Sequence, residues 1–313
     1  MAGDVLPRIL GRGRELRRRC VRIGFFLILS GVVGLCGSVL AVGLFLARPL
    51  TAVIGPPPET LPGADSVRIA SASGSSLSGW WIAGRPRGGA VVLMHGVRSN
   101  RTSMIRRAIV LHQQGFSVLL FDFQSHGESP GGGITFGRLE ARDAAAAVAF
   151  VRARLPGERI AAIGVSVGGA AAVLGEKPLP VDALVLESVY PNIDSALSNR
   201  LRTHLGKMIG AMFTPLLTPL FKSLLPPLLG VSPGDLRPVD RIGTVTAPVL
   251  VASGTHDTHT TIAEAAALFA HAPEPKQYWA APGATHADLE RQDPEAYWRV
   301  VLPFLNERLR RDH

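Results

Sequence analysis

IAAIGVSVGG, at residues 160–169, is the stretch that decides the fold. Its first six residues form a short apolar run that predicts a buried strand, and the small residues after Ser166 predict a closely packed helix. The junction matches G-x-S-x-G, the pattern of a sharp turn that lifts a serine above the carboxyl end of a strand. We therefore predict that Ser166 is a nucleophile and that Gly164 and Gly168 give its turn the necessary space. An ordinary turn with a buried serine is the alternative.

Apolar runs alternate with helical patterns on both sides of this turn. We expect strands at Val67–Ser71, Trp80–Ile82, Ala90–Met94, Val118–Phe123, Ile160–Val165, Ala183–Leu186, Val249–Ala252 and Gln277–Ala280. Helices are expected at 103–114, at 136–155 with Thr135 as its cap, and at 294–310. This alternation predicts an α/β fold, with a mainly parallel central sheet flanked by helices and the chemistry at the carboxyl ends of the strands.

A serine hydroxyl needs a neighbouring base, and the base needs an acid to orient it. Asp257 follows the strand at Val249–Ala252, and His286 follows the last strand, so both can meet Ser166 at one edge of the sheet. The order Ser, Asp, His is the one expected for a nucleophile on this kind of turn. Glu187 remains an alternative acid, and His256 and His259 remain alternative bases.

The reaction at such a serine also needs N–H donors for a developing oxyanion. The backbone N–H of Val167 directly follows the nucleophile, and the loop after Ala90–Met94 offers the N–H of Val97. His95 and Gly96 begin this loop, and we expect them to support it. The alternative is an ordinary turn at the end of a strand.

Five segments together carry a family resemblance, and they occur in a fixed order. They are LMHG (93–96), FDFQSHGES (121–129), GVSVGG (164–169), SGTHD (253–257) and GATH (283–286). On these segments, residues 66–309 resemble the serine hydrolases of the α/β-hydrolase superfamily, and the N-terminal helix makes the chain similar to membrane-anchored, monoacylglycerol-lipase-like esterases. Gln124-Ser125 stands where many relatives have Arg-Gly, which puts the shape of that loop in doubt and leaves the triad untouched.

The resemblance implies hydrolysis of an ester, thioester or amide through an acyl-serine intermediate. The substrate would be a small acyl ester or a lipid, with neither a cofactor nor a metal. A serine peptidase of the same fold and a catalytically silent, membrane-tethered binding protein are the competing interpretations.

The N-terminal segment predicts a membrane anchor. Residues 1–22 carry seven arginines and a net charge of +5, and residues 23–47 carry no charge. As a helix, the uncharged segment would be about 37 Å long, which is enough to cross a bilayer. Since basic residues stay in the cytoplasm, we expect a single pass, a cytoplasmic N-terminus and a catalytic domain on the far side, in the periplasm if the source is bacterial. A cleaved signal peptide is the alternative.

These predictions give four parts: a basic tail at 1–22, an anchor at 23–47, a linker at 48–65 and a catalytic domain at 66–313. A helical cap is expected at about 190–235, where apolar residues recur at helical spacing: Leu201, Leu205, Met208, Met212, Leu216, Leu220, Leu224 and Leu228. This stripe could line an acyl pocket, contact the membrane or pack onto the sheet.

The remaining composition narrows the function classes. The formal charge of the whole chain is +9, so residues 23–313 carry only +4, and no basic stripe with aromatic residues indicates nucleic-acid binding. Both cysteines, Cys20 and Cys36, precede the catalytic domain, which disfavours a disulfide or a cysteine-based zinc site there. The sequence leaves the oligomeric state open.

Overall fold

The computed structural model describes residues 5–310 and divides the chain into two units, Met1–Phe45 and Leu46–His313. Residues 1–4 of the predicted basic tail and residues 311–313 of the predicted catalytic domain lie outside the described residues. Residues 5–45 of helix α1 (Val5–Ala47) form the described part of the first unit. Its segment Arg19–Ala47 contains an 18-residue window with a mean hydropathy of 2.4 and is long enough to cross a membrane, a property that a membrane anchor shares with a signal sequence.

The second unit is built on an eight-stranded sheet in the order β10-β9-β8-β7-β4-β5-β3-β2. Its strands are β2 (Ala64–Ala70), β3 (Ser76–Ile82), β4 (Ala90–Met94), β5 (Ser117–Phe121), β7 (Ile160–Val165), β8 (Ala183–Glu187), β9 (Val249–Gly254) and β10 (Lys276–Ala281). Strand β3 is antiparallel to β2 and β5, and the other neighbouring strands are parallel. The structure thereby confirms the predicted mainly parallel α/β sheet.

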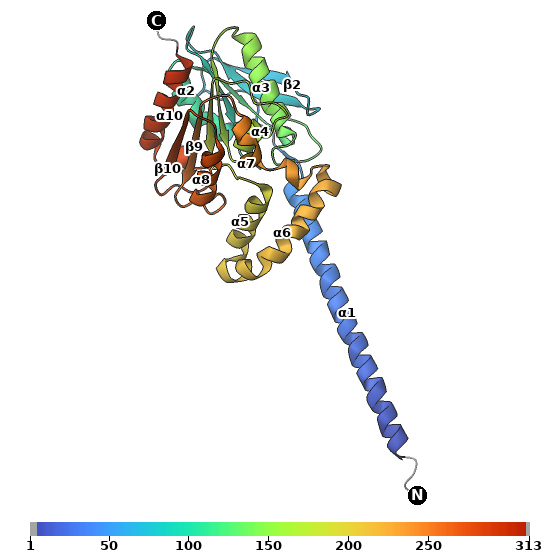
Figure 1. Cartoon of the computed structure of the whole chain (residues 1–313). Coiled ribbons are helices and arrows are strands. Elements are labelled where there is room, and N and C mark those ends of the chain that lie inside the picture. Colours follow the sequence, from blue (N-terminus) through green and yellow to red (C-terminus); the bar gives the residue numbers. More distant parts are fainter. Residues whose placement is uncertain (1–4, 311–313) are drawn as a thin grey trace. The chain divides into compact units, whose positions relative to one another are not determined.

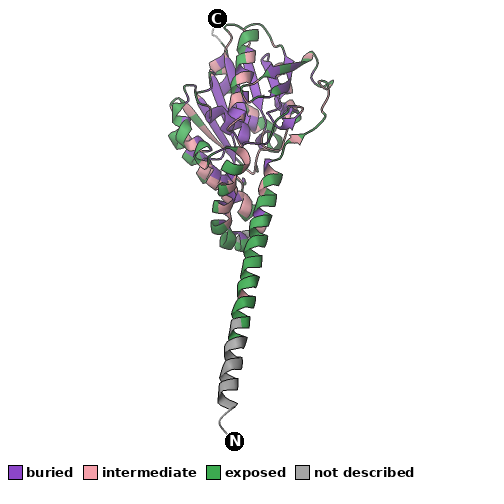
Figure 2. Ribbon diagram, turned by 90° about the vertical axis from the view of Figure 1, so that its right-hand side faces the viewer, coloured by how far each residue is buried: buried purple, intermediate pink, exposed green. Residues whose placement is uncertain are grey.

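Helices cover both faces of this sheet (Figure 1). They are α2 (Ile105–Gln113), α3 (Glu140–Arg154), α4 (Val167–Val173), α5 (Ile193–Leu205), α6 (Lys207–Leu229), α7 (Pro238–Arg241), α8 (Ile262–His271), α9 (Leu289–Gln292) and α10 (Pro294–Leu309). Helices α3, α4 and α8 share one buried cluster with the sheet, and α2 and α10 share the other. In the second unit the inner strands β4, β5, β7, β8 and β9 are buried, the edge strands β2 and β10 are partly exposed, and the outer surfaces of the helices are exposed (Figure 2).

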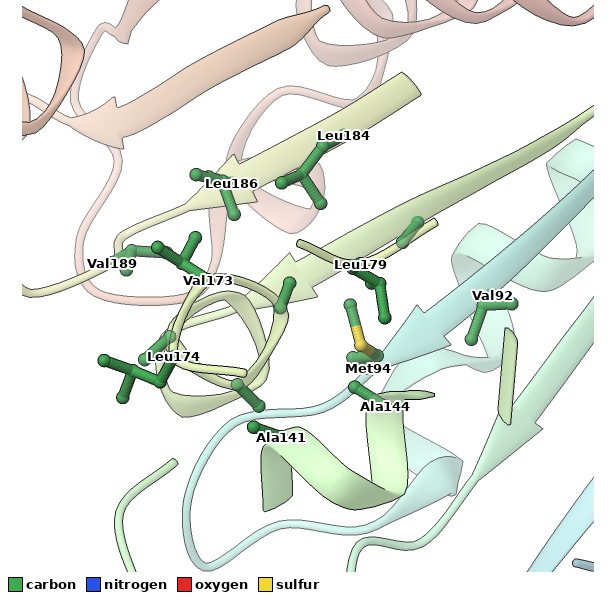
Figure 3. Packing of buried hydrophobic residues seen from close by; sticks show 14 of the residues in the cluster. Val92, Met94, Ala141, Ala144, Val173, Leu174, Leu179, Leu184, Leu186 and Val189 are labelled. Carbon is green, nitrogen blue, oxygen red and sulfur yellow. The ribbon is translucent and has the colours of Figure 1, made fainter. Parts of the chain in front are cut away.

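Successive side chains of a strand point to opposite faces of the sheet, so each inner strand contributes to both clusters. In β4, Val91 and Leu93 belong to the cluster of α2 and α10, whereas Val92 and Met94 belong to the cluster of α3 and α4. Figure 3 shows Met94 in the cluster of α3 and α4, together with apolar side chains of β8 and of these two helices. A strand buried on both faces must be apolar throughout, which explains the unbroken run AVVLM.

Residues 48–65, predicted as a linker, belong to the second unit and are fixed in it by hydrogen bonds to residues 125–128. Strand β1 (Leu50–Thr51) pairs in parallel with β6 (His126–Gly127). The N–H groups of Ile54 and Gly55 both donate to one carboxylate oxygen of Glu128, at 2.9 Å each.

The predicted helix at 136–155 is wrong at its start, because α3 begins only at Glu140. Phe136 and Gly137 have φ angles of 53° and 114°, which no α-helix accommodates. Thr135 instead closes the preceding turn, where its hydroxyl accepts the N–H of Leu139 at 2.8 Å. The C-terminal helix starts at Pro294, as expected, and the side chain of Asp293 caps it.

Helices α5 and α6 occupy the region predicted as a cap. The buried face of α6 carries Thr214, Thr218, Phe221 and Leu225 rather than the predicted apolar stripe. Met208, Met212 and Leu216 of that stripe are exposed. The apolar spacing predicted a helix here, but its surplus of leucine and methionine concealed which face meets the domain.

Candidate active site

The turn between β7 and α4 holds Ser166 in a conformation that ordinary side chains avoid. Its φ is 52° and its ψ is −114°, and such backbone strain costs about 1–3 kcal/mol and concentrates at functional sites. The N–H of Ser166 donates to the carbonyl of Glu187 on the neighbouring strand at 2.7 Å. This bond and the start of α4 fix the position of the serine.

Glycine is required on both sides of Ser166 because the backbone there leaves no room for a Cβ atom. A Cβ on Gly164 would lie 2.5 Å from the Cα of Gly169, and a Cβ on Gly168 would lie 2.4 Å from the carbonyl oxygen of Met94. Both distances are shorter than real Cβ contacts, so the helix could not pack this closely against the sheet with alanine at either position.

The structure brings Ser166, His286 and Asp257 into one hydrogen-bonded chain. The Nε2 atom of His286 lies 3.0 Å from Ser166 Oγ, and its Nδ1 atom lies 2.9 Å and 3.1 Å from the two carboxylate oxygens of Asp257. Because an ionised carboxylate only accepts hydrogen bonds, this arrangement favours the tautomer with the proton on Nδ1. Nε2 is then free to accept the proton of the serine hydroxyl.

Asp257 is held by several donors besides His286. Its Oδ1 atom accepts the backbone N–H groups of His259 and Thr260, both at 2.8 Å. Burial favours the neutral acid, but the hydrogen bond and the charge of His286, aided by these N–H groups, hold the pKa of Asp257 below its ordinary value. The carboxylate is therefore ionised and fixed in orientation.

The loop after β4 is oriented by the buried side chain of His95. Its Nδ1 atom lies 2.7 Å from the carbonyl oxygen of Gly96, and its Nε2 atom accepts the N–H of Phe123 at 3.1 Å. Burial, followed by the charge of His126, lowers the pKa of His95 to about 3, so the ring is neutral and Nδ1 donates.

This bond also constrains the predicted oxyanion donor. In a trans peptide the C=O and the N–H point in opposite directions, so fixing the carbonyl of Gly96 directs the N–H of Val97 the other way. Val97 and Gly96 both line the cavity in front of Ser166. Val167, the second predicted donor, is the first residue of α4, where backbone N–H groups have no partner within the helix.

The segment FDFQSHGES forms a buried polar support for this loop. His126 accepts the N–H of Arg98 at 3.1 Å, and Asp122 accepts the N–H of Arg101 at 2.7 Å while also pairing with its guanidinium. Gln124 donates to the carbonyl of Gly133 and to Glu140 at 2.7 Å and 2.9 Å. These local hydrogen bonds accommodate glutamine at a position that departs from the pattern of the resembled family.

The competing residues lie in other arrangements. Glu187 accepts from Arg107 Nη2 at 2.6 Å and from the hydroxyl of Tyr297 at 2.5 Å. His256 is exposed, and the ring of His259 lies 5.0 Å from that of His286 without a hydrogen bond to Ser166. Burial, followed by the charges of Arg200 and His286, lowers the pKa of His259 to about 4.

A cavity of about 340 Å³ opens in front of Ser166. Its lining combines Ser166 and His286 with two arginines and a few apolar side chains: Gly96, Val97, Ser99, Ser103, Met104, Arg107, Val165, Ser166, Arg200, His259, His286 and Ala287. The predicted leucine and methionine stripe of the cap supplies none of these residues, so the cavity is not an acyl pocket of that composition. The sequence analysis missed Arg107 and Arg200, because the helical pattern around each gives no sign of the face it turns to the site.

Among residues 5–310, no group of three or more His, Cys, Asp or Glu side chains is placed to hold a metal ion.

Comparison with protein families and curated proteins agrees with this fold. Residues 85–227 match the family model described as Serine aminopeptidase, S33. Uncharacterized protein Rv2307c of Mycobacterium tuberculosis is 33% identical over 260 residues, which cover 81% of this chain and 84% of that protein. Uncharacterized protein YfhR of Salmonella typhi is 26% identical over 290 residues, covering 87% of this chain and 89% of the relative.

Solved structures show the same architecture. The esterase Pf2001 of Pyrococcus furiosus superposes with a TM-score of 0.69 at 24% identity, covering 84% of this chain and 98% of the esterase. The α/β hydrolase GrgF from Penicillium superposes with a TM-score of 0.61 at 18% identity, covering 79% and 99% of the two chains. With the family model and the mycobacterial relative, these findings show that the chain belongs to the α/β-hydrolase superfamily and is a hydrolase.

Proposed function

We propose that this hydrolase is a serine esterase that cleaves carboxylic esters through an acyl-Ser166 intermediate. The observation that carries the proposal is the continuous chain from Asp257 through His286 to Ser166 Oγ, which ends at an open cavity. The strained turn under Ser166 and the oriented loop at Val97 support it.

The geometry gives each residue a step. His286 Nε2 takes the hydroxyl proton as Ser166 Oγ attacks the carbonyl carbon, and the N–H groups of Val97 and Val167 receive the oxyanion. The imidazolium, stabilised by Asp257, then protonates the leaving alcohol as the C–O bond breaks. Water, deprotonated by His286, attacks the acyl-enzyme, and the released serine regains the proton.

The peptidase interpretation uses the same chemical steps but needs a different substrate site. An aminopeptidase must bind a substrate ammonium group, for which a carboxylate is the natural partner. Among the described residues lining the cavity, none is Asp or Glu, and two are arginine. This charge favours an ester substrate without a free amine.

Labelling with a fluorophosphonate probe tests the proposal. Wild type should be labelled, Ser166→Ala should lose the label, and Ser99→Ala, which changes another cavity serine, should keep it. Hydrolysis of 4-nitrophenyl esters by the labelled protein should fall about 10⁴-fold or more in Ser166→Ala. A folded wild type that neither reacts with the probe nor hydrolyses esters would support the silent binding protein instead.

We also propose that Arg19–Ala47 is a retained anchor, with the N-terminus in the cytoplasm and the catalytic unit on the other side. The length and hydropathy of this helix support an anchor, and the arginines before it support the orientation. The intact mass of the membrane-extracted protein separates an anchor from a cleaved signal sequence. Digestion of the catalytic unit by protease added outside spheroplasts tests the side.

A further inference from the structure

A positively charged side chain from α5 enters the proposed active site. Arg200 lines the same cavity as Ser166, His259 and His286. It is 34 residues away from the nucleophile in sequence and reaches the cavity from the cap region rather than from the sheet.

The guanidinium of Arg200 is poorly compensated by the protein. Burial lowers its pKa, and the charges of Tyr190 and Asp257 offset only part of this effect. Its Nη1 atom donates to the carbonyl of Ala196 at 3.2 Å, one turn earlier on the helix. Within residues 5–310 no carboxylate forms an ion pair with Arg200, and Asp257 is already engaged by His286.

Arg107, the second arginine of the cavity, differs from Arg200 because it has an ion-pair partner. Arg107 forms an ion pair with Glu187 at 2.6 Å, and both side chains are buried. Burial opposes the charge of Arg107, but Glu187 and Tyr297 outweigh it and raise its pKa above the ordinary value. Its charge is therefore balanced by a direct ion pair, whereas Arg200 forms none with any residue that the structure describes.

The side chains that line the cavity consequently carry one surplus positive charge. His259 is neutral above a pH of about 4 because of its lowered pKa, and no acidic side chain is found among the described lining residues. A partly buried guanidinium without an ion-pair partner gains from a ligand that supplies a negative charge, and its planar fork of N–H groups suits a carboxylate.

We propose that Arg200 binds a carboxylate of the substrate, so that the natural substrate is an ester that carries one negative charge. This inference rests on the proposed esterase function. It makes Arg200 a specificity residue: it recognises the charged end of the substrate while the triad acts on the ester.

Matched substrates test the inference. On the acyl side, 4-nitrophenyl hemiadipate is compared with 4-nitrophenyl 6-methylheptanoate, in which an isopropyl group replaces the carboxylate. On the alcohol side, 3-carboxy-4-nitrophenyl butyrate is compared with 4-nitrophenyl butyrate. For at least one pair, wild type should have the higher kcat/KM on the anionic member, by roughly 10- to 100-fold, as expected for a charge-assisted hydrogen bond.

The variants assign that preference to one side chain. Arg200→Gln should bring the anionic-to-neutral ratio of kcat/KM close to one, and Arg200→Lys should retain part of the preference. Arg202→Gln, an exposed arginine on the same helix, is the matched control and should keep the wild-type ratio. Inhibition of fluorophosphonate labelling by adipate, weaker in Arg200→Gln than in wild type, gives a second readout that needs no turnover.

The results separate a failure of the Arg200 inference from a failure of the esterase proposal. Wild type that hydrolyses the neutral esters but disfavours both anionic ones would overturn the role of Arg200 and leave the esterase intact. An unchanged ratio in Arg200→Gln with lower kcat on all four esters would also overturn it, by showing that Arg200 only positions the triad. Loss of both labelling and ester hydrolysis in folded wild type would remove the esterase proposal and this inference together.

Discussion

Glu187 and Asp257 are two carboxylates at the carboxyl ends of neighbouring strands, β8 and β9, and their surroundings differ completely. Glu187 meets a buried guanidinium and a tyrosine hydroxyl, so its charge is neutralised where it lies. Asp257 meets an imidazole and two backbone N–H groups, so its charge is directed at a group that can change its protonation. The comparison teaches that the partners, rather than the position at the sheet edge, decide which carboxylate can serve the serine.

The largest effect is expected at Asp257. In Asp257→Asn, an amide NH₂ facing His286 favours the wrong tautomer, and kcat for a neutral ester should fall roughly 10⁴-fold. Steady-state kinetics measures this, and urea unfolding provides the check that the variant is folded. A fall of less than tenfold would mean that Asp257 does not orient the base.

Glu187→Gln should instead act on stability. Without the carboxylate, Arg107 stays buried without a counter-charge, and the free energy of unfolding should decrease by about 3–5 kcal/mol. Urea denaturation followed by fluorescence measures the change. The double variant Glu187→Gln, Arg107→Met should recover part of the loss; a 10⁴-fold fall in kcat in folded Glu187→Gln would reverse the roles of the two carboxylates.

Tyr297→Phe makes a smaller change to the hydrogen-bonded group of Arg107, Glu187 and Tyr297. The hydroxyl of Tyr297 donates to Glu187 at 2.5 Å and accepts from Arg107 Nε at 3.2 Å, and the substitution removes both bonds but keeps the ring. Hydrogen bonds to charged groups contribute about 1.5–3 kcal/mol, so the loss of stability should be of that order and smaller than in Glu187→Gln. An equal loss in both variants would assign the stabilisation to the tyrosine rather than to the ion pair.

The smallest effect, a change in the pH dependence of stability, is expected at His259, whose ring lies beside that of His286. Its pKa falls from 6.5 in the unfolded chain to about 4 in the folded one, so the unfolded state binds more protons between these values and stability decreases as the pH is lowered through them. In His259→Gln this contribution is absent. Between pH 7 and pH 5 wild type should lose roughly 1 kcal/mol more than the variant, after allowance for partial exposure.

Activity gives an independent readout of the same variant. The acid limb of kcat/KM should remain in His259→Gln, because His286 is the proposed base. Disappearance of that limb would make His259 the titrating base.

The sequence predicted the local features well, because they depend on short segments. A strand followed by Gly164-Val165-Ser166-Val167-Gly168 admits few other turns, and the loops at Asp257 and His286 each follow a short run of residues that predicts a strand. The parallel sheet then brings these loops to one edge. The order and spacing of the segments were therefore sufficient to predict where the candidate triad lies.

Features that depend on side chains meeting across the fold could not be predicted. Arg107 and Glu187 are 80 residues apart, and nothing in either segment shows that the two are partners. Arg200 and the exposed face of α6 depend on how the cap helices rotate against the domain, which the excess of apolar residues in this region left undetermined. Thr135 illustrates the same limit locally, because a threonine that closes a turn and one that caps a helix look alike in sequence.

The pairing of β1 with β6 has a practical consequence for producing the catalytic unit without its apolar helix. A shortened chain that began at residue 66 would lose Leu50 and Thr51 from their pairing with His126 and Gly127, and would leave Glu128 without two of its donors. Because His126 holds the N–H of Arg98, such a chain would be damaged at the loop beside the nucleophile rather than at a dispensable terminus. The shortest soluble version should start near Ala47, where the carbonyl oxygen still accepts the N–H of Ile134 at 2.8 Å.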